Sequence, residues 1–195
     1  MTHVGATCLF QALQHNQTLV QLSLGNSDAR HKNNVGAKGA RHLRELLQMN
    51  QSLSILDLKG NALCDQGMFQ LCQGLRHNTG LTHLNISQNG FSAFGVEFLK
   101  DALIANAKNG LLELDISYNN VEAHGVSHLS TFIQHESCRL KSLNVEGCGI
   151  QGQHSLNFFK GLKKCQTLRQ LKAEKNDFSH PVLRRALTAA LGSSL

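Results

Sequence analysis

One pattern of apolar and polar positions recurs along the chain, and it reads L-x-x-L-x-L-x-x-N-x-L. The first leucines of successive copies are 34, 28, 30, 29 and 28 residues apart. They are Leu19, Leu53, Leu81, Leu111, Leu140 and Leu168. The copies tolerate substitutions, since Cys148 occupies the Asn position of one copy and Ala173 an apolar position of another. Self-similarity at a nearly fixed period indicates a repeat protein.

Each copy contains a strand pattern followed by a helix pattern. The x-L-x-L-x segment alternates with period two, which is typical of a half-buried strand. The Asn that follows is expected to hydrogen-bond backbone groups left without partners where the strand ends. Residues 67–76 and 95–103 carry apolar side chains at helical spacing, with Leu71 and Leu75 on one face. One strand and one helix cannot bury their apolar faces alone, so stacked copies must share a continuous core.

These repeats, each with a full helix, resemble the ribonuclease-inhibitor-like class of leucine-rich repeats. Ribonuclease inhibitor, NOD-like receptors, the Ran GTPase-activating protein and tropomodulins contain repeats of this class. The resemblance implies an α/β leucine-rich-repeat solenoid: a right-handed βα horseshoe with parallel strands on the concave face and helices on the convex face. Because the class serves many unrelated partners, the resemblance defines the fold far better than the function.

We expect residues 1–195 to form a single leucine-rich-repeat domain. Residues 1–18 are predicted to hold a helix without a preceding strand, because residues 5–16 align with residues 67–78. The strand-bearing repeats are expected to begin near residues 19, 53, 81, 111, 140 and 168. A last helix is expected at residues 181–191.

The composition fits a soluble protein of the cell interior. Of the 195 residues, 41% are hydrophobic and 16% charged, and no apolar run approaches the roughly 20 residues that cross a bilayer. The first residues lack the basic and apolar regions of a secretory signal. The six cysteines are scattered and form no C-x-x-C pair, so we expect free thiols, several of them buried. These features predict a cytoplasmic protein that does not associate with a membrane.

No catalytic, metal-binding or cofactor-binding motif is found. The chain lacks G-x-S-x-G, P-loop, H-E-x-x-H and G-x-G-x-x-G patterns. His15, His77 and His135 share one position near the end of a helix, where a cation favours the helix dipole. Adjacent repeats offer no shared Cys or carboxylate there, which argues against a metal site. We therefore expect no enzyme activity, no cofactor and no metal.

The outward strand positions are the candidate binding residues, because such side chains point out of the concave face. The centre of this face is polar and mostly acidic, and the alternation also places Ser87 and Ser117 on it. The residues predicted to bind a partner are Asp57, His83, Asn85, Glu113, Asp115, Tyr118, Glu146 and Lys172. An ordinary solvated sheet face is the alternative interpretation, since any exposed strand carries polar residues.

Two further regions are charged. An insertion after the first strand carries Arg30, His31 and Lys32, which form a candidate binding loop or a tolerated, idle insertion. Residues 1–138 hold nine Lys and Arg against ten Asp and Glu, a net −1, whereas residues 139–195 hold ten against three, a net +7. That basic end serves solubility or an acidic partner. Nucleic acid is not expected, because no aromatic residues lie between the basic ones.

The leading hypothesis is a non-catalytic protein-interaction module whose concave face binds a protein partner with a basic surface. One alternative is a GTPase-activating protein resembling the Ran activator, with Arg30 or Asn89 placed against the bound nucleotide. Another is the ligand-sensing repeat segment of a NOD-like receptor. The sequence does not indicate the oligomeric state.

Overall fold

The computed structural model describes residues 1–26 and 33–178, apart from the side chains of residues 153 and 154. Its helices are α1 (His3–Leu13), α2 (Gly36–Met49), α3 (Cys64–Leu75), α4 (Ala93–Ala105), α5 (Glu122–Gln134) and α6 (Gly152–Lys164). Its strands are β1 (Gln21–Ser23), β2 (Ile55–Asp57), β3 (His83–Asn85), β4 (Glu113–Asp115), β5 (Ser142–Asn144) and β6 (Gln170–Lys172). The expected helix at 181–191 lies outside the described residues.

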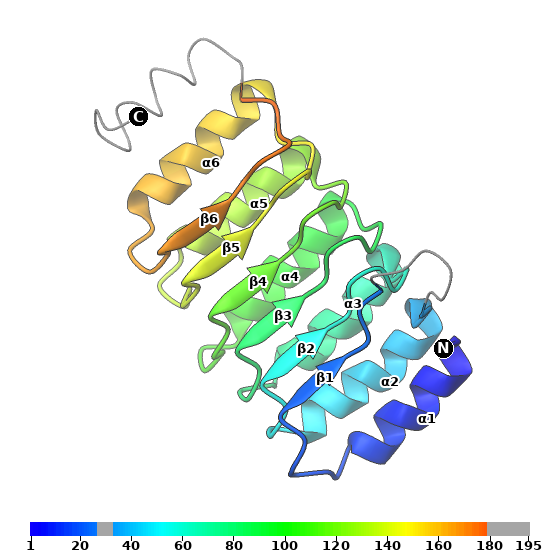
Figure 1. Ribbon diagram of the computed structural model, residues 1–195. Coiled ribbons are helices and arrows are strands. Elements are labelled where there is room, and N and C mark those ends of the chain that lie inside the picture. Colours follow the sequence, from blue (N-terminus) through cyan, green and yellow to red (C-terminus); the bar gives the residue numbers. More distant parts are fainter. Residues whose placement is uncertain (27–32, 179–195) are drawn as a thin grey trace.

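The strands form one parallel sheet in the order β1-β2-β3-β4-β5-β6, and the helices before and between them cover one side of this sheet (Figure 1). The other side of the sheet is open, and we call it the concave face. The predicted solenoid of alternating parallel strands and helices is therefore confirmed. The predicted helices 67–76 and 95–103 fall on α3 and α4, and both helices begin a few residues earlier than the apolar spacing indicated.

The strands pair without any shift in register, so equivalent positions of successive repeats lie side by side. Leu56 pairs with Leu84, and Leu84 pairs with Leu114. These leucines are at most 2% exposed and point into the core between sheet and helices. Burial of each such leucine contributes roughly 2 kcal/mol, which explains why the period-two alternation predicted the strands.

In the repeats that have it, the Asn hydrogen-bonds the backbone where the strand ends, as predicted. Asn89 donates to the carbonyl oxygens of Leu58 and Ser87 at 2.9 and 3.0 Å, and it accepts from the backbone N–H groups of Asn61 and Leu63 at 3.0 and 3.3 Å. Its side chain is thereby shared between two repeats. The same bonding recurs at Asn61, Asn119 and Asn176. This row of side chains ties the repeats together along one edge of the sheet.

A second row of asparagines lies at the opposite edge, and the repeat pattern did not predict it. Asn50 donates to the carbonyl oxygens of Leu13 and Asn16, and Asn78 donates to those of Leu47 and Asn50. Asn106 continues the row in the next repeat with the same geometry. Each side chain satisfies a carbonyl at the end of the preceding helix, where the helix itself provides no donor.

Asn26 and Asn33 flank the basic insertion and hydrogen-bond each other. The backbone N–H of Asn33 donates to Oδ1 of Asn26 at 2.6 Å, and Nδ2 of Asn26 donates to the carbonyl oxygen of Asn33 at 3.0 Å. The candidate loop residues Arg30, His31 and Lys32 fall outside the described residues. Asn33 also donates to the carbonyl oxygen of Leu24 at 3.0 Å, as Asn61 does to that of Leu58 in the next repeat.

Candidate functional site

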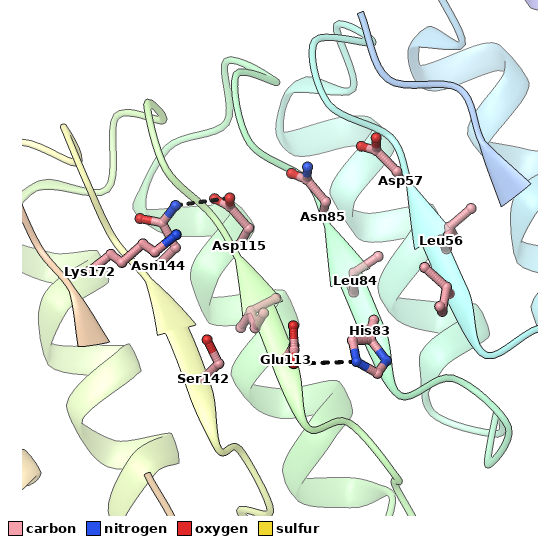
Figure 2. A pocket seen from close by; sticks show the side chains of 12 residues that line it. Leu56, Asp57, His83, Leu84, Asn85, Glu113, Asp115, Ser142, Asn144 and Lys172 are labelled. Atoms are coloured by element: carbon pink, nitrogen blue, oxygen red, sulfur yellow. Dashed lines mark hydrogen bonds and ion pairs between the residues drawn. The ribbon is translucent and has the colours of Figure 1, made fainter. Parts of the chain in front are cut away.

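Two rows of side chains run across the concave face, one residue from each strand in each row. The pairing register defines both rows. The upper row consists of Ser23, Asp57, Asn85, Asp115, Asn144 and Lys172. The lower row consists of Gln21, Ile55, His83, Glu113, Ser142 and Gln170. Between β2 and β6 these rows line a shallow depression of about 240 Å³ (Figure 2).

The Asp and Asn side chains of the upper row have a structural role that the sequence did not reveal. In each of Asp57, Asn85, Asp115 and Asn144, one side-chain oxygen accepts from the backbone N–H two residues later, at 2.9–3.0 Å. This bond closes a turn directly after the strand, a role for which Asp and Asn are equally suited. The position therefore requires an Asx acceptor in these four repeats, while its charge is left free to vary.

The second polar atom of each side chain points along the row. Oδ2 of Asp115 accepts from Nδ2 of Asn144 at 2.9 Å, and Oδ2 of Asp57 accepts from the hydroxyl of Ser23 at 3.1 Å. Within the described part of the chain, neither carboxylate has a cationic partner. The amide Nδ2 of Asn85 has no hydrogen-bond partner among the described residues. The centre of the depression thus presents the carboxylates of Asp57 and Asp115, which lack a described cationic partner, and the free amide donor of Asn85.

The lower row contains a contact between a histidine and a carboxylate on neighbouring strands. Nε2 of His83 lies 3.4 Å from Oε1 of Glu113, and the two side chains are 37% and 56% exposed. Nδ1 of His83 also contacts the hydroxyl of Thr82 at 2.7 Å. Both predicted residues therefore lie in the depression, and their side chains contact each other (Figure 2).

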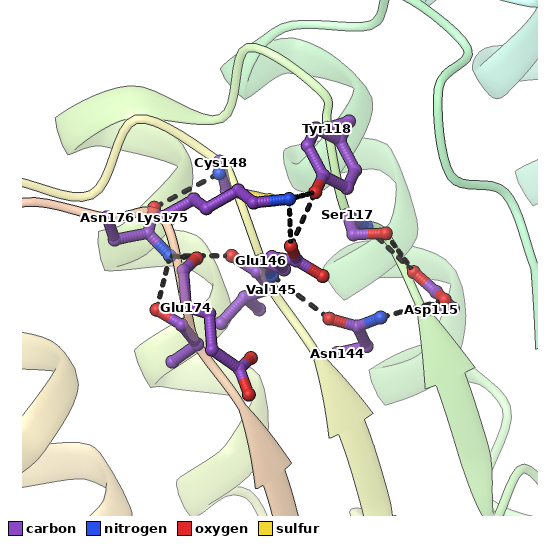
Figure 3. A network of polar contacts seen from close by, with 11 residues as sticks. Asp115, Ser117, Tyr118, Asn144, Val145, Glu146, Cys148, Glu174, Lys175 and Asn176 are labelled. Atoms are coloured by element: carbon purple, nitrogen blue, oxygen red, sulfur yellow. Dashed lines mark hydrogen bonds and ion pairs between the residues drawn. The ribbon is translucent and has the colours of Figure 1, made fainter.

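Tyr118 and Glu146 lie on the rim of the face and share a cation that sequence reasoning did not include. Lys175 Nζ lies 2.8 Å from the Glu146 carboxylate and 5.0 Å from the centre of the Tyr118 ring. The Tyr118 hydroxyl donates to Glu146 and accepts from Lys175 (Figure 3). The hydrogen bonds from Lys175 and Tyr118 hold the pKa of Glu146 below its ordinary value. The negative charge of Glu146 is therefore paired with the positive charge of Lys175, whereas Asp57 and Asp115 have no such partner among the described residues.

The Tyr118 ring is held against the backbone of the next repeat. A Cβ atom on Gly147 would lie 2.9 Å from Cδ1 of the ring, and Gly147 has a φ of +60°. Only glycine combines this backbone conformation with so close an approach. Tyr118 itself is 39% exposed, so it presents a fixed aromatic edge to solvent beside the depression.

Lys172 closes the upper row at β6. Its side chain is exposed and forms no hydrogen bond or ion pair with any described residue. All eight residues predicted to bind a partner thus lie on or beside the concave face. Ser87 and Ser117 do not present the polar surface that the alternation suggested, because they are 2% and 4% exposed and their hydroxyls donate to Asn85 and Asp115.

In the part of the chain that the structure describes, the other chemically reactive side chains are not arranged as a site. Among the described residues, no three His, Cys, Asp or Glu side chains are grouped to hold a metal ion. His15 and His77 are exposed, and His135 contacts Ser137 just after α5. Burial raises the pKa of the Cys148 thiol to about 12, so this thiol is not a nucleophile near neutral pH. No described helix is both long and apolar enough to cross a membrane.

The GTPase-activating alternative rested on Arg30 or Asn89. Asn89 is 1% exposed and all of its polar atoms serve the asparagine row, so its nomination is wrong. Arg30 lies outside the described residues.

Comparison with known families agrees with the architecture. A family model described as Leucine Rich repeat matches residues 50–72, 77–100 and 109–130. The chain belongs to the leucine-rich-repeat family. These matches contain β2, β3 and β4 and most of α3, α4 and α5.

Leucine-rich-repeat relatives of NOD-like receptor type are similar to the chain over most of its length. It is 36% identical over 141 residues to human NACHT, LRR and PYD domains-containing protein 12, which covers 72% of the chain and 13% of that protein. It is 30% identical over 174 residues to human NACHT, LRR and PYD domains-containing protein 14, covering 74% of the chain and 15% of that protein. The chain therefore spans about one seventh of these relatives.

Solved leucine-rich-repeat structures share the fold. The actin-binding site 2 of leiomodin-1 superposes with a TM-score of 0.54 at 20% identity, covering 93% of the chain and 84% of that structure. The tropomodulin C-terminal domain of Caenorhabditis elegans superposes with a TM-score of 0.55 at 12% identity, covering 97% and 90%. At this identity the likeness concerns the fold alone.

Proposed function

We propose that this leucine-rich-repeat domain is a non-catalytic protein-interaction module that binds a partner with a basic surface through its concave face. The observation that carries the proposal is the pair Asp57 and Asp115. Both carboxylates face an open depression, and no described cation neutralises either of them. Their orientation is fixed beforehand by the turn hydrogen bonds, so little side-chain entropy is lost when a partner binds.

The character of the face predicts specificity more than high affinity. Charged groups guide association and exclude partners of like charge, whereas aromatic anchors supply most of the energy at tight interfaces. Here Tyr118 is the exposed aromatic residue beside the depression. We expect moderate affinity that weakens as the salt concentration rises.

The test compares a concave-face variant with a control that changes the charge equally. The variant D57N/E113Q/D115N removes three negative charges from the depression. The control E97Q/E122Q/E136Q removes three from α4, α5 and the loop after α5. Immobilised domains are used to capture cytosolic proteins, which are quantified by mass spectrometry, and captured candidates are then purified and titrated. We expect the concave variant alone to lose binding; equal binding by the concave variant and the unmodified domain contradicts the proposal.

A second candidate is that the chain is the ligand-sensing repeat segment of a NOD-like receptor in the cytoplasm. The similarity to human NACHT, LRR and PYD domains-containing proteins supports it. An antibody against the domain should then detect, in the cytosolic fraction, a protein several times longer than 195 residues whose peptides include a NACHT domain. Detection of a 195-residue protein alone contradicts this candidate and leaves the first one in place.

A further inference from the structure

The charged side chains of the upper row recur on every second strand. Asp57 is on β2, Asp115 on β4 and Lys172 on β6, and amides occupy β3 and β5. Neighbouring strands lie about 4.8 Å apart, so the charged positions follow one another at about 9.6 Å and the row spans about 19 Å. A partner that pairs with all three must present complementary charges at the same two distances.

These two distances discriminate between backbone conformations of the partner. A β-strand rises about 3.3 Å per residue and alternates sides, so side chains on one side recur at about 6.6 and 13 Å. An α-helix returns to the same face after seven residues, at about 10.5 and 21 Å. A polyproline II segment has three residues per turn and a rise of about 3.1 Å, which gives about 9.3 and 18.6 Å. The polyproline II spacing is nearest to both distances.

The free amide of Asn85 favours the same conformation. It lies between Asp57 and Asp115 in the upper row and lines the depression, and its Nδ2 has no partner among the described residues. An α-helix lying on the face would offer no acceptor there, because its central carbonyl groups bond within the helix. A polyproline II backbone keeps its carbonyl groups free. A shallow depression of about 240 Å³ also suits a single extended chain better than a helix about 10 Å across.

We propose that the concave face binds a polyproline II segment with basic residues at two positions three apart and an acidic residue three positions further along. This inference rests on the proposed function and names the class of partner. The basic side chains pair with Asp57 and Asp115, and the acidic side chain pairs with Lys172. Asn85 donates to a carbonyl between the two basic residues. The lower row then contacts the other side of the segment.

Labelled synthetic peptides test the spacing directly by fluorescence anisotropy on the full chain. The first probe carries Arg at positions 1 and 4 and Glu at position 7 in a proline-rich frame. A second probe has the reversed order, because the row does not define the direction of the segment. A control peptide of the same composition has Arg at positions 1 and 3. We call the first two peptides the in-phase probes, because their charges are three residues apart. One of them should bind about tenfold tighter than the control, because each of its charges then lies opposite Asp57, Asp115 or Lys172.

Variants of the domain identify the contacts. D57N/D115N keeps the turn acceptors, as Asn85 and Asn144 demonstrate, and should weaken the in-phase probe about tenfold. K172E should weaken that probe too, and a probe with Lys in place of Glu should recover binding to K172E. Equal binding of the in-phase and control peptides overturns the proposal. So does tighter binding of an alanine-rich helical peptide with Arg at positions 1 and 8 and Glu at 15.

The two proposals fail in different ways. If all peptides fail while capture of proteins still depends on Asp57, Glu113 and Asp115, the polyproline II segment is wrong and the interaction face stands. If capture is also insensitive to these residues, the proposed function itself is wrong.

Discussion

Asp115 accepts a hydrogen bond from the side-chain amide of Asn144 in the next repeat at 2.9 Å, while its other oxygen accepts from the backbone N–H of Ser117 at 2.9 Å. One carboxylate therefore closes a turn within its own repeat and bonds to a neighbouring one. Asn144 closes the equivalent turn of the next repeat. The relationship separates two properties of this position: the acceptor that the turn requires and the charge that a partner could recognise.

This separation predicts different results for two substitutions at one site. Asp115→Asn keeps the turn acceptor and should change the free energy of unfolding by less than about 1 kcal/mol. Asp115→Ala leaves the N–H of Ser117 and the amide of Asn144 without their acceptor and should cost about 1–2 kcal/mol. Urea denaturation followed by circular dichroism measures both, with the exposed Glu136→Ala as control. An equal loss for the Asn and Ala variants would show that the charge itself stabilises the fold.

The buried asparagine row should contribute more than the exposed face does. Asn89→Ala removes the partner of backbone groups on Leu58, Ser87, Asn61 and Leu63 at a position that is only 1% exposed. We expect a loss of about 3 kcal/mol in the free energy of unfolding.

Asn176 provides the comparison for Asn89, because it makes equivalent bonds but is partly exposed. Asn176→Ala should lower the free energy of unfolding by less, since water reaches the freed groups. Equal losses for the two variants would argue against burial as the cause.

We predict that exposed and buried cysteines differ in their reactivity towards an alkylating reagent. Cys8 and Cys64 are exposed and should react with iodoacetamide at pH 8. Cys72, Cys138 and Cys148 are buried, and burial raises the pKa of each thiol, to about 12 for Cys148. They should react only after unfolding in urea. Peptide mass spectrometry measures the labelling at each position, and labelling of Cys148 in the native protein at the rate of Cys8 would contradict the packing.

The contacts of Glu146 with Lys175 and Tyr118 predict how the stability of the fold depends on pH. Lys175 and the Tyr118 hydroxyl lower the pKa of Glu146 from its ordinary value of 4.5. Because the pKa is lower in the folded state, this contribution to stability is present above about pH 4.5 and is lost as the pH falls through the folded pKa. Lys175→Gln should raise the pKa of Glu146, measured by NMR titration of its side-chain carboxyl carbon.

The Lys175→Gln variant is expected to keep the backbone conformation. Gln88 occupies the equivalent position in another repeat, and its φ is +54°, against +55° for Lys175. The same Glu146 midpoint in both proteins would contradict the contact with Lys175.

The strands, the helices between them and the first asparagine row follow from the sequence because each depends on short spacings. The alternation of Leu56 and Leu58 places both in the core whatever the neighbouring repeat contains. The second row was not predicted, although Asn50 and Asn78 each stand three residues before the first leucine of a repeat. The carbonyl groups that these amides satisfy lie at the end of the preceding helix, and only the stacking of the repeats brings them within reach.

For the concave face, the sequence by itself determined which side chains point outward from the strands. Only the tertiary structure decided which of those charges are neutralised. Asp57 and Glu146 look alike as outward carboxylates, yet Lys175 pairs with Glu146 and no described cation pairs with Asp57. The physical reason is the stacking of repeats, which brings Lys175 and Tyr118, 57 residues apart in the chain, into hydrogen-bond contact.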